Sequence, residues 1–392
     1  MPAHLLVAGG GIGGLAGALA LARKGHRIDL LEQAAVFGEI GAGVQLGPNA
    51  TKRLHALGLA ASLDAIAAKP EALVVRSAAS HSVLARMPLG HSVSERYGAP
   101  YLCVHRADLH ALLLDAVRTH GDVALATGAR VAQVQTSDDL VCVSTVDARA
   151  WEGDALIGAD GLWSVVRQQV EDVATAPRAT GHTAWRALIA QSALPAALRS
   201  GQVDVWLGPQ LHAVAYPVRG GEGLNVVVIA ESAPAGDARD WDQASSLAAL
   251  QQATGRCGTE LQSLLDAMPD WRAWTLNDRP PLTAAEGMAR GRVALLGDAA
   301  HPMVPYLAQG AGMAIEDATA LADAVGRGGP ADLPDAFALY AAARWQRNAR
   351  VQARAHRNGE IFHASGPVRL GRDLAMRALG AALLDQPWLY GG

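Results

Sequence analysis

The sequence predicts an α/β fold in which a parallel-sheet domain is interleaved with an antiparallel-sheet domain and followed by C-terminal helices. Three observations lead to this prediction. A strand, a glycine turn, a helix and a second strand follow one another at the N-terminus. Strand-like apolar runs with little helical signal between them occupy residues 183–231, and residues 335–362 have helical character. This order of elements is typical of two combined sheet architectures.

The N-terminal unit begins with a short apolar strand at residues 4–8. Residues 9–14 read Gly-Gly-Gly-Ile-Gly-Gly, which contains the pattern G-x-G-x-x-G, and they open a helical stretch at residues 15–24. Residues 27–31 form a second apolar strand that ends at Glu32. A strand, glycine turn, helix and acidic strand end in this order predict a Rossmann-type βαβ unit.

Each part of this unit has a physical role toward a dinucleotide. Gly9 permits the tight turn, Gly11 lets the backbone approach a pyrophosphate, and Gly14 lets the helix pack closely on the strand. The helix N-terminus offers free N–H groups and a partial positive charge to phosphates. Glu32 can accept hydrogen bonds from a ribose hydroxyl. Nothing in the turn distinguishes NAD from FAD.

Composition sets limits on the class of protein. The chain has 392 residues, of which 50% are hydrophobic and 18% charged, so it predicts a well-cored globular protein. The net charge of −4 gives no electrostatic argument for binding nucleic acid or an anionic membrane. No apolar run reaches the roughly 18 residues that a membrane span needs. The oligomeric state stays open, with a homodimer among the options.

The cysteines and the N-terminus point to a cytoplasmic protein. The three cysteines are widely spaced, odd in number and without a C-x-x-C pair, so we expect neither a disulfide framework nor a metal site. The apolar residues 15–22 follow the glycine turn and have no basic segment before them, which argues against a secretion signal.

Further elements follow along the chain. A second glycine region at residues 38–49 suits a loop lying along a flat ligand, followed by a helix at residues 50–57. Residues 70–100 alternate apolar and polar, which indicates sheet excursions outside the first domain. A helix is expected at 109–119, and three strands returning to the nucleotide domain at 131–134, 141–144 and 155–160.

The second half predicts an antiparallel sheet domain, a more helical stretch at residues 241–266, a strand at 292–298 and helices at 314–325 and 335–362. The predicted nucleotide domain is discontinuous and comprises residues 1–70, 101–175 and 280–330. The predicted substrate domain comprises residues 71–100 and 176–279. Residues 331–392 are expected to form a C-terminal helical segment.

Three short motifs, taken in order, carry a family resemblance. The first is the glycine turn with Glu32. The second is a strand ending in Asp160-Gly161, and the third is Gly297-Asp298-Ala299-Ala300-His301 with its continuation through residues 309–312 to Glu316-Asp317. Together they resemble the single-component FAD-dependent aromatic hydroxylases, most closely the branch of salicylate hydroxylase and 3-hydroxybenzoate 6-hydroxylase. The resemblance covers nearly the whole chain.

The resemblance implies FAD as cofactor. Asp298 ends a strand, where an acid can accept a ribityl hydroxyl, and the helix starting near Gln309 can turn its N–H groups toward the flavin. For Arg106 the alternative is a surface residue at the start of a helix, and for Asp160 the alternative is a helix N-cap. The expected FAD-binding residues are Gly11, Ile12, Gly13, Gly14, Glu32, Gln33, Gly43, Val44, Arg106, Val131, Asp160, Asp298, Gly310, Ala311 and Gly312.

A candidate substrate face lies at residues 211–217. Alternation places His212, Val214 and Tyr216 on one side of a strand. The spacing of His212 and Tyr216 resembles a pair that contacts the phenol in related hydroxylases, so both are candidate catalytic residues, with Val214 between them. A structural sheet histidine is the alternative for His212. Pro305 and Tyr306 are the remaining candidate substrate residues.

The resemblance implies a monooxygenase that uses NAD(P)H, with NADH favoured, and O₂ to hydroxylate a small phenolic acid through a flavin C4a-hydroperoxide. The sequence has no second dinucleotide-binding unit for the nicotinamide cofactor. The best match is 3-hydroxybenzoate 6-hydroxylase, which forms gentisate. However, 3-hydroxybenzoate enzymes carry glutamine where Pro305 stands, and the salicylate enzymes have histidine after their proline. Salicylate or hydroxynicotinate hydroxylation therefore stays open, as does an oxidase or epoxidase acting on a larger apolar ring.

Overall fold

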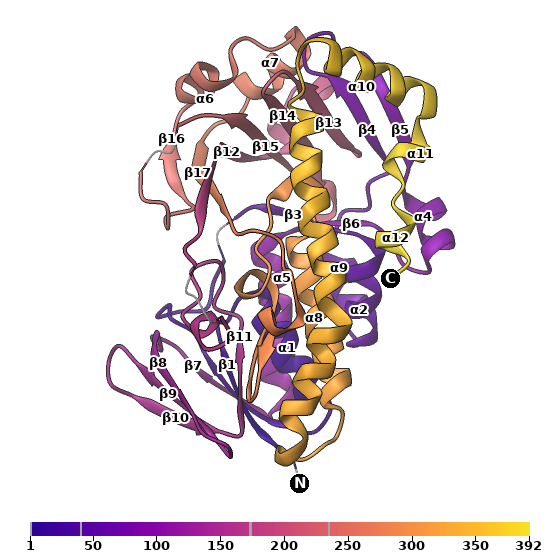
Figure 1. Ribbon diagram of the computed structural model, residues 1–392. Coiled ribbons are helices and arrows are strands. Elements are labelled where there is room, and N and C mark those ends of the chain that lie inside the picture. Colours follow the sequence, from indigo (N-terminus) through magenta and orange to yellow (C-terminus); the bar gives the residue numbers. More distant parts are fainter. Residues whose placement is uncertain (1, 40, 172–174, 234–235) are drawn as a thin grey trace.

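The computed structural model describes residues 2–39, 41–171, 175–233 and 236–392. Figure 1 shows two sheet layers joined by a long helix, with the N-terminus at one end of the molecule. The first layer is a six-stranded sheet in the order β18-β19-β11-β1-β2-β7. Its pairs are parallel from β19 to β7, and β18 is antiparallel to β19. The strands are β1 (His4–Ala8), β2 (Arg27–Leu31), β7 (Val123–Ala126), β11 (Ala155–Gly158), β18 (Ala289–Arg290) and β19 (Val293–Leu295).

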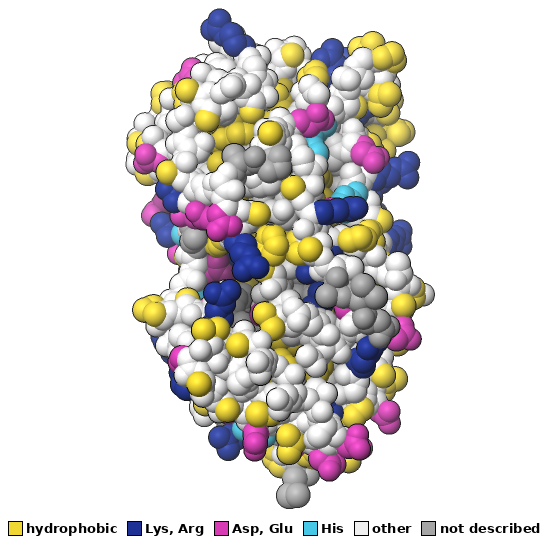
Figure 2. Space-filling view, turned by 60° about the vertical axis from the view of Figure 1, so that its left-hand side comes forward, with side chains coloured by type: hydrophobic (Ala, Val, Ile, Leu, Met, Phe, Trp, Pro, Cys, Tyr) yellow, Lys and Arg dark blue, Asp and Glu magenta, His cyan; other side chains and the backbone are white. Residues whose placement is uncertain are grey.

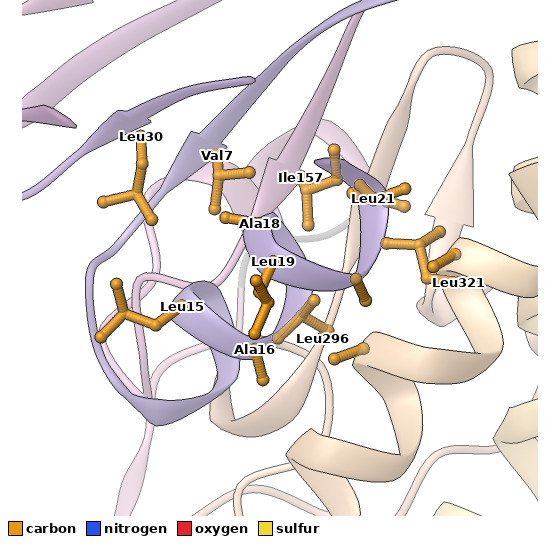
Figure 3. Close-up of a cluster of buried hydrophobic side chains, with 14 of the residues drawn as sticks. Val7, Leu15, Ala16, Ala18, Leu19, Leu21, Leu30, Ile157, Leu296 and Leu321 are labelled. Atoms are coloured by element: carbon orange, nitrogen blue, oxygen red, sulfur yellow. The ribbon is translucent and has the colours of Figure 1, made fainter. Parts of the chain in front are cut away.

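Helix α1 (Ile12–Ala22) lies at the centre of the hydrophobic core of this layer, and ten of its eleven residues are buried. A helix that is apolar on all sides must be covered on all sides. Figure 3 shows Leu15, Leu19 and Leu21 of α1 among side chains from the sheet and from α8, such as Ile157 and Leu321. Truncating one of these leucines to alanine costs about 2–5 kcal/mol. The helix starts three residues before the predicted position, inside the glycine turn itself.

A separate three-stranded antiparallel sheet contains two of the predicted strands. The strands expected at 131–134 and 141–144 form, and they pair with each other and with a third strand outside the parallel sheet. Only the strand at 155–158 joins that sheet. The three strands are β8 (Val131–Thr136), β9 (Val141–Thr145) and β10 (Ala150–Gly153). Local alternation predicts strands, whereas the pairing partner depends on distant residues.

The second layer is an eight-stranded sheet in the order β16-β17-β12-β15-β14-β13-β4-β5. All neighbours are antiparallel except β13 and β4, which are parallel. One face of this sheet is covered by α6 and α7, and the other faces the first layer. The strands are β4 (Ala72–Ser77), β5 (Val83–Pro88), β12 (Arg178–Ala190), β13 (Val203–Gly208), β14 (Leu211–Val218), β15 (Gly223–Glu231), β16 (Gln243–Ser245) and β17 (Trp271–Asp278).

Helix α9 (Leu333–Phe362) runs along both layers (Figure 1). Its first half packs Phe337 and Tyr340 into the core of the parallel sheet. Its second half places Ala355 against Ala184 and Ile229 of the antiparallel sheet. One continuous helix therefore contributes to both hydrophobic cores.

The loop predicted at residues 38–49 contains a short strand, β3 (Gly43–Leu46), which pairs with β6 (Leu102–His105). A helix at residues 90–97 was not predicted. The remaining helices are α2 (Pro48–Ala56), α3 (Ala60–Ile66), α4 (Gly90–Tyr97), α5 (Arg106–His120), α6 (Leu247–Thr254), α7 (Thr259–Asp266), α8 (Gly310–Val325), α10 (Gly366–Leu379), α11 (Ala381–Leu384) and α12 (Pro387–Tyr390).

Acidic and basic side chains are interspersed on the face shown in Figure 2, which carries no broad patch of one sign. Among the described residues, no helix combines the length and apolar character that crossing a membrane requires.

Candidate active site

The glycine turn is held from both sides. Gly9 has φ +107°, and a side chain there would meet the Ala159 carbonyl. The Gly10 N–H donates to Glu32 Oε2 at 2.7 Å, and His110 Nε2 donates to the Gly10 carbonyl at 2.8 Å. A Cβ on Gly14 would lie 1.9 Å from the Gly9 carbonyl oxygen. Gly9 and Gly14 are therefore required by the fold itself.

Gly11 is different, because it borders open space. A Cβ built on Gly11 meets only Glu39 Oε1 at 3.8 Å, so the N-terminus of α1 is accessible there. The neighbouring Gly13 instead packs against Leu296, and Ile12 is buried. The residues present therefore leave room for a phosphate at Gly11, with free helix N–H groups to bind it.

Glu32 and its neighbours line the end of β2. The carboxylate of Glu32 accepts from Gly10 and, at 2.8 Å, from the Ala34 N–H. A carboxylate offers about four acceptor positions, so ribose hydroxyls can still be bound. Gln33 is exposed. The chain at Gly128 and Ala129 pairs with the backbone of Ala34 and Glu32 and continues to the half-buried Val131.

Arg106 lies at the start of α5, beside the strand β3. Its Nη2 forms an ion pair with Glu39 at 3.0 Å, and its guanidinium stacks on Trp241 at 4.8 Å. Its Nε is buried without a hydrogen-bond partner among the described residues. A buried donor without a partner is costly and is the kind of atom that a cofactor satisfies. The backbone of Arg106 is fixed by its N–H bond to Ala42, next to Gly43 and Val44.

Asp298 and the start of α8 face this region from the other side. The side chain of Asp298 is exposed to solvent. Burial raises the pKa of Asp298, and the charges of His301 and Arg106 oppose that rise. Helix α8 begins at Gly310, so the N–H groups of Gly310, Ala311 and Gly312 precede the first intrahelical bond.

The two glycines of α8 differ in their surroundings. A side chain on Gly310 would meet nothing within 4 Å, so this position borders open space. A side chain on Gly312 would instead meet Gln309 Oε1 at 3.0 Å and Asn49 Nδ2 at 3.6 Å. These two amides are bonded to each other at 2.9 Å. The protein, and not only a ligand, therefore requires glycine at 312.

Asp160 acts as a cap in the structure. One oxygen accepts from Ser164 Oγ at 2.5 Å, and the other from the N–H groups of Val165 and Val166 at 2.7 and 3.1 Å. Burial raises the pKa of Asp160, and these hydrogen bonds oppose the rise. The capping alternative from the sequence is thus present, and a contact of Asp160 with a cofactor stays a prediction.

A buried ionic network holds the third motif in place. Asp317 accepts from His301 Nε2, from the Gly297 N–H at 3.2 Å and from Arg344 Nε at 2.8 Å. Burial alone would raise the pKa of Asp317, but the charges and hydrogen bonds of His301 and Arg344 outweigh it and hold the pKa well below its ordinary value. His301 therefore holds this motif in place.

The inner face of the eight-stranded sheet carries the candidate substrate residues. His212, Val214 and Tyr216 of β14 point to this face, and the alternate residues Leu211, Ala213 and Ala215 pack into the core under α6 and α7. Across the sheet, His212 lies opposite Ile229, and Tyr216 lies opposite Asn225. The side-chain alternation predicted for β14 is present.

Tyr216 joins the sheet to the cofactor side of the molecule. Its ring lies directly over Gly43, where a Cβ would approach it to 2.4 Å. Gln45 hydrogen-bonds Tyr216 and also accepts from Tyr101 at 2.7 Å. Burial, and then the neighbouring Cys103, raises the pKa of Tyr216, and the interaction with Gln45 opposes that rise.

His212 is part of an aromatic cluster at the other end of the same strand face. Its ring lies edge-on to Tyr306 at 5.3 Å, and its Nδ1 shares a 2.8 Å hydrogen bond with His363 Nε2. Burial, then the neighbours His363 and His182, lowers the pKa of His212 well below its ordinary value, so the imidazole is neutral. The hydroxyl of Tyr306 is buried without a partner among the described residues, and Pro305 beside it is exposed.

The sequence did not reveal several residues that build this region. Tyr101 and His110 stand in segments without a motif, and Glu39 and Gln45 lie inside the second glycine region without a role assigned from the sequence. Each is recognised by a partner far along the chain, so no local spacing could have identified it. The polar residues within the glycine region were the one available signal.

Comparison with known proteins places this geometry in a family. The model described as FAD binding domain matches residues 3–328. The 3-hydroxybenzoate 6-hydroxylase of Polaromonas naphthalenivorans is 41% identical, with 100% of this chain and 96% of that protein covered. The 6-hydroxynicotinate 3-monooxygenase of Bordetella bronchiseptica is 36% identical, with 91% of each chain covered.

Solved structures agree in fold. HpxO of Klebsiella pneumoniae, complexed with FAD and uric acid, has a TM-score of 0.86 and 27% identity, covering 97% of this chain and 94% of that chain. A salicylate hydroxylase substrate complex has a TM-score of 0.84 at 24% identity, covering 100% and 96%, which supports the fold alone. The open space at Gly11 and Gly310 and the Nε of Arg106, which has no partner among the described residues, fit the same cofactor. The chain belongs to the FAD-binding-domain family and is one of its FAD-dependent aromatic monooxygenases.

Proposed function

We propose that this enzyme hydroxylates a small phenolic acid, 3-hydroxybenzoate, at C6 to give gentisate, with NADH as the reductant. The observation that carries the proposal is the inner face of β14, where His212 and Tyr216 stand at the two ends of one strand face. They are four positions apart, or about 13 Å between Cα atoms. An aromatic ring with a polar group at each end would match the spacing of these two polar side chains.

His212 is the proposed partner of the phenolic hydroxyl. Ring hydroxylation needs an electron-rich ring, and removal of the phenolic proton raises electron density at the para carbon. The buried imidazole of His212 is neutral and can accept that proton. In 3-hydroxybenzoate the carbon para to the hydroxyl is C6. Bound FAD, once reduced by NADH, supplies the activation of O₂.

Tyr216 is the proposed partner of the carboxylate. Its hydroxyl stands beside Gln45 at the end of the strand face opposite His212, where it can donate to a carboxylate. Tyr101 is held by the same amide at 2.7 Å. Val214 lies between the two polar residues and offers an apolar surface to the ring. Pro305 and Tyr306 are the proposed residues on the opposite wall.

The proposed cofactor residues divide by position. Gly11 to Gly14 and the N-terminus of α1 bind the pyrophosphate, and Glu32, Gln33 and Val131 bind the adenosine half. Gly43, Val44 and Arg106 lie along the flavin half. Asp160 and Asp298 stand near the middle of the cofactor. The N–H groups of residues 310–312 stabilise negative charge on the reduced ring.

A second candidate substrate has a specific observation in its favour. The position of Pro305 carries glutamine in 3-hydroxybenzoate enzymes and proline in salicylate enzymes, so this wall of the pocket favours salicylate or a hydroxynicotinate. The aromatic residue that follows, Tyr306, differs from the histidine of the salicylate enzymes. The histidine-tyrosine pair on β14 and the identity to the Polaromonas enzyme give 3-hydroxybenzoate precedence.

The test is an NADH-oxidation screen with 3-hydroxybenzoate, salicylate, 4-hydroxybenzoate and 6-hydroxynicotinate, each with product identification and H₂O₂ measurement. We expect 3-hydroxybenzoate to accelerate NADH oxidation most and to yield about one gentisate per NADH. If NADH oxidation is tightly coupled to product formation with salicylate or 6-hydroxynicotinate but not with 3-hydroxybenzoate, that compound is the substrate instead. Stimulation by none of them would favour a larger apolar ring as substrate.

A further inference from the structure

Three potential metal ligands meet where the eight-stranded sheet contacts the end of α9. His182 lies on β12 and Glu231 directly opposite it on β15, while His363 is the residue that caps the C-terminal end of α9. One ligand atom of each residue lies within 4.8 Å of the others. None of these residues belongs to the FAD or substrate positions assigned above.

Each of the three side chains is oriented by a partner on its other side. His182 Nδ1 lies 3.2 Å from the Thr180 carbonyl, which can only accept, so Nδ1 carries the hydrogen and Nε2 has a free lone pair. Glu231 Oε2 accepts from Gln210 Nε2 at 2.8 Å. Metal-binding imidazoles and carboxylates are usually held by second partners of this kind.

The backbone of Gln210 ties two of the ligands together. Its N–H donates to the His363 carbonyl at 3.0 Å, and its own carbonyl accepts from the Glu231 N–H at 3.1 Å. Gln210 has φ +57°, a left-handed conformation uncommon for a residue with a side chain. The tight connection between β13 and β14 therefore keeps Glu231 close to His363.

His363 presents a buried nitrogen without a partner. The residue is 7% exposed, and its Nε2 is engaged by His212 at 2.8 Å. Its Nδ1 has no hydrogen-bond partner among the described residues. Leaving a buried imidazole nitrogen unsatisfied costs about 1–3 kcal/mol. A ligand at Nδ1 would remove that cost.

We propose that His182 Nε2, Glu231 and His363 Nδ1 bind one divalent transition-metal ion of the zinc type. Two imidazoles and one carboxylate form a ligand set that zinc uses, with a fourth position left for water. Mg²⁺ and Ca²⁺ prefer oxygen ligands and do not suit two imidazoles. The ligand atoms of a tetrahedral zinc site are about 3.3 Å apart, so the three side chains must close in from separations of up to 4.8 Å. The exposed Glu231 and the half-buried His182 have the freedom to do so.

The ion would join β12, β15 and α9 at a single point. Because the unfolded chain does not hold these three residues together, binding would stabilise the folded state. The site also adjoins the proposed substrate face through the hydrogen bond between His363 and His212. An ion on His363 Nδ1 leaves the hydrogen on Nε2, which then donates to His212 Nδ1, so metal binding and proton acceptance by a neutral His212 would exclude each other. Its test is therefore a binding measurement, which does not depend on the substrate assigned to the enzyme.

The experiment uses the untagged, FAD-loaded enzyme, treated with a chelator that is then removed, and titrated calorimetrically with ZnCl₂. We expect one Zn²⁺ per chain, a rise in thermal midpoint with ZnCl₂, and tetrahedral ligand-field absorption bands with CoCl₂. Glu231→Gln and His182→Asn should each weaken Zn²⁺ binding by about 100-fold or more. Both side chains are at least partly exposed, so these variants should retain FAD.

The matched control is Glu260→Gln, an exposed carboxylate on α7, which should bind Zn²⁺ like the parent enzyme. Loss of binding in both ligand variants, with binding retained in the control, supports the site. No saturable binding by the parent enzyme overturns it. Binding that keeps its affinity in either ligand variant overturns it as well.

Discussion

At the scale of the residue, His212 connects the sheet, the end of α9 and the proposed substrate. Its side chain is buried, its Nδ1 is bonded to His363, and its ring edge meets Tyr306. Burial favours the neutral imidazole, which keeps a lone pair available. If His212 has only a structural role, replacing it should leave the rate of hydroxylation unchanged, and that rate can be measured.

Replacing His212 by alanine should slow hydroxylation by about 10²–10⁴-fold, the usual cost of losing a general base. FAD content should be unchanged, since β14 belongs to the other sheet layer. NADH oxidation should continue with a larger share of H₂O₂, and Tyr216→Phe should act in the same direction but less strongly. Product, NADH and H₂O₂ are measured together, with the peripheral His120→Ala as control. Normal, tightly coupled turnover by His212→Ala would assign His212 a structural role.

Glu32 illustrates a residue that serves both the fold and the ligand. Glu32→Ala should weaken FAD binding by about 1–3 kcal/mol, because a ribose hydroxyl and the Gly10 N–H both lose an acceptor. Fluorescence titration of the apoprotein with FAD measures the change. Glu32→Gln keeps one acceptor oxygen and should lose less. Equal affinity of Glu32→Ala and the parent protein would remove Glu32 from the cofactor site.

At the scale of the element, the helices α1 and α8 both carry glycines in their first turn, but for different reasons. Gly14 of α1 is required because a side chain would collide with the Gly9 carbonyl, whereas Gly310 of α8 borders open space. The first is a property of helix packing on a strand. At Gly310 the protein leaves space unfilled, so a substitution at this position tests where the flavin ring lies.

Gly310→Val should therefore fold normally but lose FAD or turnover, because its side chain would occupy the space of the ring. The matched control is Gly371→Val on α10, which is also a helical glycine with nothing within 4 Å. In both variants the change from glycine to valine alters helix propensity by a similarly small free energy. Circular dichroism, flavin content and turnover distinguish them. Full turnover by Gly310→Val would show that the ring does not lie there.

The network around Asp317 connects α8 and α9, and its loss should be costly. Asp317→Asn leaves Arg344 buried without its full counter-charge, which should cost about 3–5 kcal/mol of folding stability at pH 7. The folded-state pKa of Asp317 is lowered, so its contribution is fully present above the unfolded value of 3.8 and disappears as pH falls through the folded value. The free energy of unfolding of the parent enzyme should therefore fall below about pH 4, and Asp317→Asn should not show this part of the decrease.

The free energies of unfolding of both proteins are measured with denaturant at pH 7 and pH 3. The same dependence on pH in the parent and the variant would contradict the stabilising role of Asp317.

The elements differ in how well the sequence predicts them. The glycine turn, Glu32 and the alternation of β14 depend on neighbours within a few residues, so local spacing was sufficient. The separate sheet β8-β9-β10 and the strand order of the large sheet depend on pairing between distant segments. The polar contacts of Gln45, His110 and His363 arise only after that pairing, which explains why the sequence left them unassigned. The division into domains by residue range, and the roles of the individual site residues, stay predictions.

At the scale of the whole molecule, the two sheets share α9. Because its first half is in one hydrophobic core and its second half in the other, unfolding of one layer should remove support from the other. We expect a single calorimetric transition, shifted upward by bound FAD in proportion to the logarithm of free FAD concentration. Two separate transitions in the apoprotein would contradict this coupling.

The continuous path of α9 also limits how the enzyme can exchange its ligands. A helix of 30 residues is about 45 Å long, and bending it at one point breaks backbone hydrogen bonds. A hinge motion that separates the two sheet layers would therefore have to bend α9 or pull one of its halves out of a hydrophobic core. Because both are costly, we expect the two layers to keep their relative position when ligands bind and leave.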